Sequence, residues 1–167
     1  MRAKLTIELT GPDGALLAAR SASNSVMQAG ARLIAQLFAG AGAGITHMGV
    51  GINDTPESDT FTTAVLNNAP GGGNDPLQGP VEAAIPSDAF QIDLDETRRV
   101  IRVRVRGTIP ANGAVGTVRE AGLVSRSGDT AVLYNRVTFA PIVKGSDHEL
   151  TLFWEINFPY GDLQGVF

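Results

Sequence analysis

Alternation of apolar and polar residues recurs along the chain and predicts strands. Near the N-terminus Leu5, Ile7 and Leu9 alternate with polar neighbours, which is the period of a half-buried strand. Turn-forming residues follow at 11–14, and residues 15–20 can return as a second strand, so we predict an opening hairpin. Five further strands are predicted from their alternation and flanking turns: 45–51, 100–109, 117–124, 130–139 and 150–158.

One segment has the spacing of a helix. Its apolar residues lie three, four and seven positions apart on one stripe: Val26, Leu33, Ile34, Leu37 and Phe38. Residues 23–25 offer N-caps and Gly40 suits the C-terminal end, so we predict a helix over about 25–39. A lone helix of that length is marginal in water, and its apolar stripe should therefore pack on a sheet.

Together these elements predict a mainly β, single-domain protein spanning 1–167. The expected architecture is an antiparallel β-sandwich, jelly-roll-like, or a barrel, with one helix packed near the N-terminus. Glu120 lies within an apolar strand and, if buried, requires a partner such as an arginine on a neighbouring strand. The predicted core comprises Val26, Leu33, Ile34, Leu37, Phe38, Glu120, Leu123, Phe139, Leu152, Trp154, Ile156 and Phe158.

Composition adds many turns and one long loop. The chain of 167 residues holds 20 Gly and 9 Pro, and residues 67–80 are so rich in Gly, Pro, Asn and Asp that no periodicity survives. We predict an exposed, mobile loop there, which is either a plain connection or a contact with a partner. The candidate contact residues are Pro70, Gly71, Gly72, Gly73, Asn74 and Asp75.

Charge is the next informative feature. A net charge of −4 argues against nucleic-acid binding by bulk electrostatics, and no apolar run has the form of a signal peptide or is long enough to cross a bilayer. Five arginines nevertheless gather within nine positions: Arg98, Arg99, Arg102, Arg104 and Arg106. They form either an outer sheet face paired with Asp and Glu of adjacent strands or a docking face for an acidic protein surface.

No candidate chemistry survives inspection of the motifs. The absence of cysteine excludes disulfides and thiolate catalysis, and the Ser, Asp and His within 145–148 are too close in sequence to align as a triad. The glycine runs lack a following Lys-Ser or Lys-Thr for phosphate, so they do not indicate a nucleotide site. Asp93, Asp95 and Glu96 could hold calcium, but salt bridges to the nearby arginines are the favoured interpretation. We expect no catalytic residue, cofactor or metal.

Three stretches resemble small structural proteins of tailed-bacteriophage virions. The first joins Asn24, Ser25, Val26, Gly30, Ala31, Leu33 and Ile34 to residues 45–51 and 53–56; the others are 118–123 and 136–144 leading into 150–158. The resemblance covers about 70 residues. It does not extend to the 67–80 loop or to the arginine-rich strand.

The resemblance implies a β-rich virion component without catalytic residues, located at the tail tip, fibre or baseplate, or on the capsid as a decoration (cement) protein. It would be made in the bacterial host cytoplasm, and its partners would be itself, as a homo-oligomer such as a trimer, and other virion proteins. No nucleic acid, membrane or small-molecule substrate is expected. The alternative is a receptor- or sugar-binding module at a fibre tip, in which Trp154 or Tyr160 would contact the sugar. An enzyme using His47 or His148 ranks third.

Overall fold

A computed structural model describes residues 2–70 and 74–161. Strands account for most of the ordered elements, in an order that follows the alternating segments of the sequence. The elements are β1 (Arg2–Thr10), β2 (Leu16–Ser23), β3 (Ser25–Val26), α1 (Gln28–Phe38), β4 (His47–Gly51), β5 (Glu82–Ala84), the short 3-10 helix η1 (Ser87–Ala89), β6 (Phe90–Asp95), β7 (Val100–Ile109), β8 (Gly116–Ser127), β9 (Thr130–Lys144) and β10 (Glu149–Pro159).

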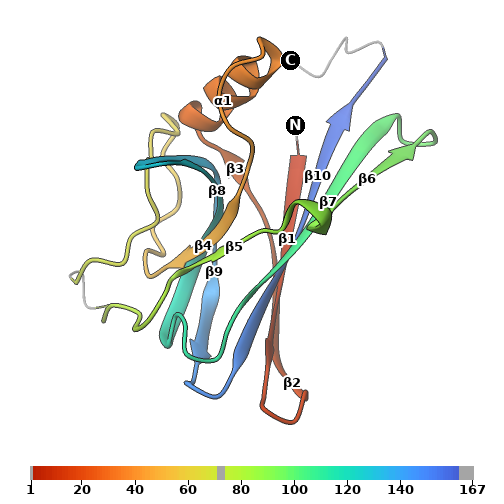
Figure 1. The fold of residues 1–167 in the computed structure, drawn as a ribbon. Coiled ribbons are helices and arrows are strands. Elements are labelled where there is room, and N and C mark those ends of the chain that lie inside the picture. The colour runs from red at the N-terminus through yellow and green to blue at the C-terminus, as the bar shows by residue number, and fades with distance from the viewer. Residues whose placement is uncertain (1, 71–73, 162–167) are drawn as a thin grey trace.

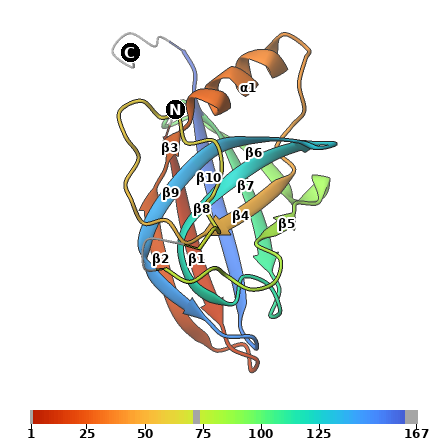
Figure 2. The same cartoon turned by 90° about the vertical axis from the view of Figure 1, so that its left-hand side faces the viewer.

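The strands form two antiparallel sheets that face one another (Figure 1; Figure 2). Sheet A has the order β2-β1-β10-β7-β6, and sheet B has the order β3-β9-β8-β4-β5. Within the described residues, the chain crosses between the sheets four times: from β2 to β3 at one edge, from β5 through η1 to β6 at the other edge, and from β7 to β8 and from β9 to β10 between these edges. This arrangement confirms the prediction of a mainly β, antiparallel sandwich with one helix near the N-terminus.

The core lies between the sheets, because alternate residues of each strand point inward. Leu5 on β1 pairs with Trp154 on β10 and Trp154 with Val105 on β7, and all three are buried. Ten of the twelve predicted core residues are buried or pack against the core or its edge. The fully buried ones are Leu33, Glu120, Leu123, Leu152, Trp154 and Ile156, and the partly buried ones packed against the core are Val26, Ile34, Phe139 and Phe158.

The helix prediction was wrong at both ends of its stripe. Ser25 and Val26 pair with β9 instead of starting the helix, so α1 begins at Gln28 after an N-cap, Met27, that makes no side-chain cap. Leu37 is 38% exposed and Phe38 is 96% exposed, because α1 meets the sheet chiefly through its first turns. At Gly30 an added Cβ would lie 2.0 Å from the carbonyl oxygen of Tyr134, so only glycine permits this close approach. Gly40 ends the helix with a φ of 75°, as predicted.

The glycines of β4 also permit a close approach. Gly49 and Gly51 alternate with the buried Met48, Val50 and Ile52, and their missing side chains face outward from sheet B. A Cβ at Gly49 would lie 2.8 Å from Leu66, and one at Gly51 would lie 2.6 Å from the carbonyl oxygen of Asn67. The segment 52–68 therefore lies directly on the outer face of sheet B.

The 67–80 prediction was wrong in part. The three candidate contact glycines, Gly71, Gly72 and Gly73, lie outside the described residues. Leu77 is only 4% exposed and belongs to the core. The side chain of Asn68 accepts a hydrogen bond from the backbone amide of Leu77 at 2.7 Å and donates one to the backbone carbonyl of Leu77 at 3.1 Å. Asn74 is half-buried and donates to the carbonyl of Ile52 at 3.2 Å. Pro70 and Asp75 are exposed as predicted.

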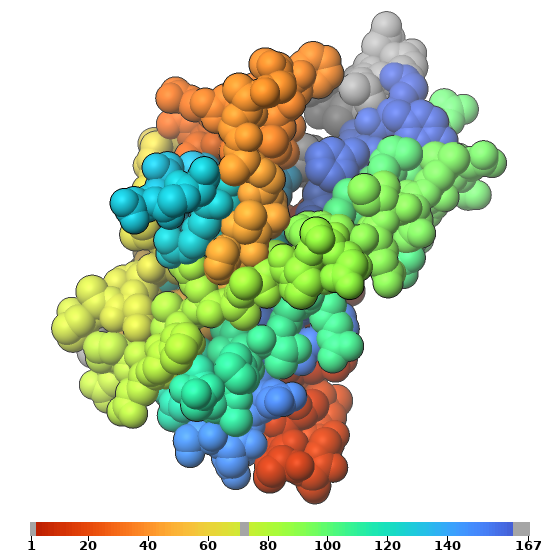
Figure 3. All heavy atoms as spheres, in the orientation of Figure 1, coloured from red at the N-terminus to blue at the C-terminus, as the bar shows by residue number. Residues whose placement is uncertain are grey.

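Two regions protrude on opposite sides of the sandwich. The β6–β7 tip, residues 92–101, points to the upper right in Figure 1, and the 57–65 loop lies on the left. Figure 3 shows the same separation in the space-filling view. Sequence analysis missed β5 and β6. β5 has only three residues and no alternation, whereas Phe90–Asp95 of β6 alternates apolar and polar residues, so a strand signal was available there.

Candidate functional site

A buried ion pair joins two strands of sheet B. Arg136 on β9 donates through Nε to Glu120 Oε2 on β8 at 2.6 Å, and the two residues are 3% and 0% exposed. This confirms the prediction that Glu120, once buried, is neutralised by an arginine of a neighbouring strand. Charge and hydrogen bonding together compensate the desolvation of the carboxylate.

The same pair holds the segment that crosses sheet B. Glu120 Oε1 accepts from the backbone amides of Asn67 and Asn53, at 2.7 and 3.4 Å. The guanidinium of Arg136 donates to the carbonyls of Thr55 and Asn53, at 3.1 and 3.3 Å, and to the Glu57 carboxylate at 3.2 Å. We define Glu120, Arg136, Glu57, Asn53, Thr55 and Asn67 as the buried polar cluster. Its groups satisfy one another, so the cluster acts as a lock between segment 53–67 and sheet B.

The arginines of β7 lie on the outer face of sheet A. Arg102 donates to Asp95 at 2.6 Å and lies 3.5 Å from Glu155, while Arg104 pairs with Asp93. The backbone amide of Arg98 and the guanidinium of Arg102 lower the pKa of Asp95, and the pairing with Asp93 raises the pKa of Arg104. These contacts confirm a salt-bridged outer face for these two arginines and explain the acidic residues 93 and 95.

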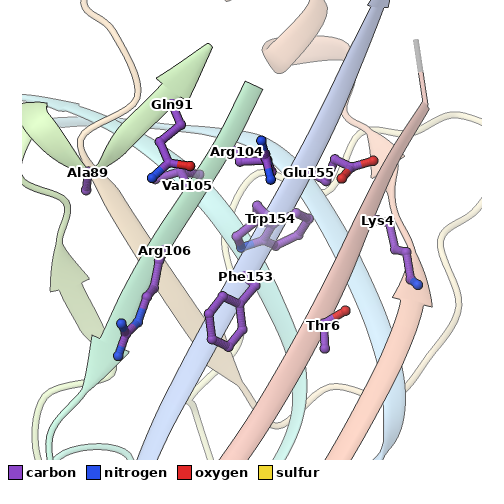
Figure 4. A pocket seen from close by; sticks show the side chains of 10 residues that line it. All are labelled: Lys4, Thr6, Ala89, Gln91, Arg104, Val105, Arg106, Phe153, Trp154 and Glu155. Atoms are coloured by element: carbon purple, nitrogen blue, oxygen red, sulfur yellow. The ribbon is translucent and has the colours of Figure 1, made fainter. Parts of the chain in front are cut away.

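Arg106 has a different environment. Its guanidinium stands 5.7 Å from the centroid of the Phe153 ring, a distance suited to a cation–π contact. Around this ring lies an open depression of roughly 380 Å³, bordered by Lys4 on β1 and Gln91 on β6 (Figure 4). The depression is lined by three cationic side chains, Lys4, Arg104 and Arg106, and by one carboxylate, Glu155. This excess of positive charge can accept a further carboxylate.

The five arginines do not form one patch. Arg98 and Arg99 belong to the turn of the β6–β7 tip, where the Arg98 side chain is 73% exposed and Arg99 has a φ of +53°. Sequence analysis grouped them with the β7 arginines because the five lie within nine positions, although Arg98 and Arg99 precede the strand predicted at 100–109.

The 145–148 segment forms a turn, as predicted. The amide of Gly145 donates to His148 Nδ1 at 3.0 Å, and Ser146 is exposed. The adjacent Lys144, which sequence reasoning missed, is 1% exposed and donates to the carbonyls of Ala111 and Gly145 at 2.8 and 3.4 Å. Its burial lowers its pKa. Its position two residues after the inward Ile142 was the available signal.

The residues expected to serve a sugar-binding module or an enzyme differ in their exposure and contacts. Trp154 is 1% exposed and buried in the core, so it offers no surface on which a sugar could stack, whereas Tyr160 is 39% exposed. His47 Nδ1 lies 2.8 Å from the hydroxyl of Thr46.

Among residues 2–70 and 74–161, no group of three or more metal-ligating side chains is close enough to hold an ion, and no helix there is long and apolar enough to cross a membrane. Comparisons of the chain with protein-family models, with curated proteins and with solved structures find no match.

Proposed function

We propose that the protein is a non-enzymatic structural component of a tailed-bacteriophage virion, which assembles as an oligomer on the tail or on the capsid as a decoration protein. The fold agrees with this role, because β-sandwiches readily present large outer faces for assembly. The phage resemblance of three stretches motivates the choice of particle.

One observation carries the proposal. The three stretches that resemble phage structural proteins lie far apart in sequence, yet their polar residues meet in the buried polar cluster. Asn53 and Thr55 come from the first stretch, Glu120 from the second and Arg136 from the third. Residues that share one buried contact behave as a unit of the fold, which supports treating the stretches as one pattern.

The depression beside Phe153 is the surface we assign to a partner protein of the particle. Arg106 and Lys4 make no ion pair within the described residues and are therefore available to a carboxylate. The partner would be an acidic surface, and its affinity would be multiplied by the repeated copies of an assembled particle.

The test is mass spectrometry and cross-linking of intact particles produced by the phage or prophage that encodes the chain. We expect the protein in purified particles, with cross-links from Lys4 to another particle protein. Lys4→Glu with Arg106→Glu should deplete it from particles at least tenfold, while Glu8→Lys, a charge change at a neighbouring outward position, should not. Presence of the chain only in the particle-free fraction would refute the proposal.

A further inference from the structure

The β6–β7 tip exposes a face that forms the core elsewhere in sheet A. Across the sheet, Ile156 pairs with Val103 and Val103 with Ile92, and exposure rises from 5% at Ile156 to 70% at Ile92. One step further out, Leu94 pairs with Ile101 and is 56% exposed. Nothing in the described parts of the chain covers these side chains. A contiguous exposed apolar face indicates an interaction site.

The tip also carries an excess positive charge. Its two aspartates are already paired with the arginines of β7. The turn adds the exposed Arg98 and Arg99 against a single exposed acid, Glu96. Counted together with Arg102 and Arg104, the β7 partners of its two aspartates, the tip carries four arginines against three acids. It therefore combines apolar side chains with a net charge of about +1.

The 57–65 loop on the opposite side has the complementary character. Val65 is 68% exposed and Phe61 is 40% exposed. Asp59 makes no ion pair within residues 2–70 and 74–161, whereas Glu57 is held by Arg136. The loop therefore combines apolar side chains with a net charge of about −1.

The conformation of this loop is preformed. Phe61 has a φ of +50°, a region that costs a non-glycine residue free energy. Hydrogen bonds hold it there: its amide donates to the carbonyl of Ser58 at 3.0 Å, and its carbonyl accepts from the amide of Gln28 at 2.9 Å. A preformed loop reduces the ordering entropy that binding would otherwise cost.

We propose that the β6–β7 tip of one copy binds the 57–65 loop of a second copy. The two surfaces match in apolar character and oppose one another in charge, so burial would provide the affinity and charge the orientation. Because they lie on opposite sides of the molecule (Figure 1; Figure 3), the contact is head-to-tail and propagates into a ring or filament. This inference deepens the proposed structural role, on which it rests for its biological setting, by naming the partner as a second copy.

A symmetric pairing of two tips is disfavoured by the same residues. A contact between two tips would bring together two surfaces of the same net positive charge, with the exposed Arg98 and Arg99 of both copies near one another, and like charges repel. In contrast, the 57–65 loop of a second copy would place one acid, Asp59, beside the arginines of the turn.

Sedimentation velocity over a range of concentrations tests the contact. The wild type should form species larger than a dimer at high concentration and low salt. The tip variant, Ile92→Thr with Leu94→Thr, and the loop variant, Asp59→Lys with Val65→Thr, should each associate at least tenfold more weakly. The matched control is Leu16→Thr with Val143→Thr, whose side chains are 60% and 70% exposed, and it should associate like the wild type.

Mixing provides the decisive measurement. The tip variant keeps an intact loop and the loop variant keeps an intact tip, so their equimolar mixture should form a heterodimer and nothing larger. Circular dichroism checks that each variant folds, and Arg98→Glu with Arg99→Glu, confined to the exposed turn, replaces a tip variant that does not.

Three results would overturn the inference: a wild type that stays monomeric throughout, tip variants that assemble normally, or a mixture that stays monomeric. Monomeric behaviour would also be the result if another particle protein, and not a second copy, occupies the tip. Detection of the chain in particles is a separate readout: head-to-tail assembly without incorporation into particles would refute the virion role alone, and incorporation of a strictly monomeric protein would refute the contact alone.

Discussion

The outer faces of both sheets carry arginine–carboxylate pairs, but the pair on sheet B is covered by a loop segment and the pairs on sheet A are open to solvent. In sheet B, Arg136 and Glu120 meet at 2.6 Å beneath segment 52–68 with side chains 3% and 0% exposed. In sheet A, Arg102 and Asp95 also meet at 2.6 Å, but with side chains 20% and 21% exposed. The two pairs have the same length but should contribute differently to stability. A buried charge that loses its partner is not solvated by water, whereas an exposed one is.

Removing the arginine from the covered pair should have the largest effect. Arg136→Met leaves Glu120 as an uncompensated buried carboxylate and releases the carbonyls of segment 53–55, so we expect a loss of about 3–5 kcal/mol in the free energy of unfolding. Chemical denaturation gives this value. Arg102→Met on the open sheet is the matched control and should lose several-fold less. Equal losses of unfolding free energy in the two variants would show that burial beneath segment 52–68 does not strengthen the Arg136–Glu120 pair.

A moderate effect is expected from loosening the contact of α1 with sheet B. Gly30→Ala places a Cβ about 2.0 Å from the Tyr134 carbonyl oxygen, so the helix must shift. Overpacking of this kind should cost about 2 kcal/mol, more than alanine gains in helix propensity. The control is Gly44→Ala, where nothing lies within 4 Å of the added Cβ. Thermal unfolding of both variants measures the difference, and an unchanged Gly30→Ala midpoint would contradict the close packing.

The smallest expected change in stability comes from Asp95 on the solvent-exposed face of sheet A, and it depends on pH. The pKa of Asp95 is lowered from 3.8, first by the backbone amide of Arg98 and then by Arg102. A lowered acid pKa contributes stability above 3.8, which disappears as the pH falls through the folded-state value. Asp95→Asn should therefore lower the unfolding midpoint slightly at neutral pH, and the difference from wild type should vanish in strong acid. Asp88→Asn, at an exposed aspartate, is the control. A difference that grows as the pH falls below 3.8 would reverse the assigned sign.

Much of the fold was predictable where a local pattern was strong. Strict alternation located β7 at residues 100–109, and a carboxylate inside an apolar strand pointed to a partner arginine for Glu120. The other donors to Glu120 were not predictable, because the amides of Asn53 and Asn67 reach it from 67 and 53 residues away in the sequence. Phe38 was assigned to the core because periodicity shows one face of a helix but not how far the sheet beneath it extends.

The candidate surfaces were predictable only in part. The composition of residues 98–106 identified the arginine cluster. Its division was not predictable, because Arg102 and Arg104 pair with acids of β6 whereas Arg106 lies beside Phe153 of β10, and these contacts depend on which strands flank β7. The apolar exposure of Ile92 and Leu94 had no local signal, since the same residues under sheet B would form ordinary core.

By itself, the sequence determined that the chain is mainly β, where most of its strands lie, and that a buried carboxylate on β8 requires an arginine, because side-chain alternation and charge neutrality are local constraints. Only the tertiary structure decided which arginine, which loop is locked across sheet B, and which apolar side chains are uncovered. Those outcomes depend on the relative extent of two sheets built from segments far apart in sequence, and burial, which sets the strength of every ion pair here, exists only once the sheets have packed.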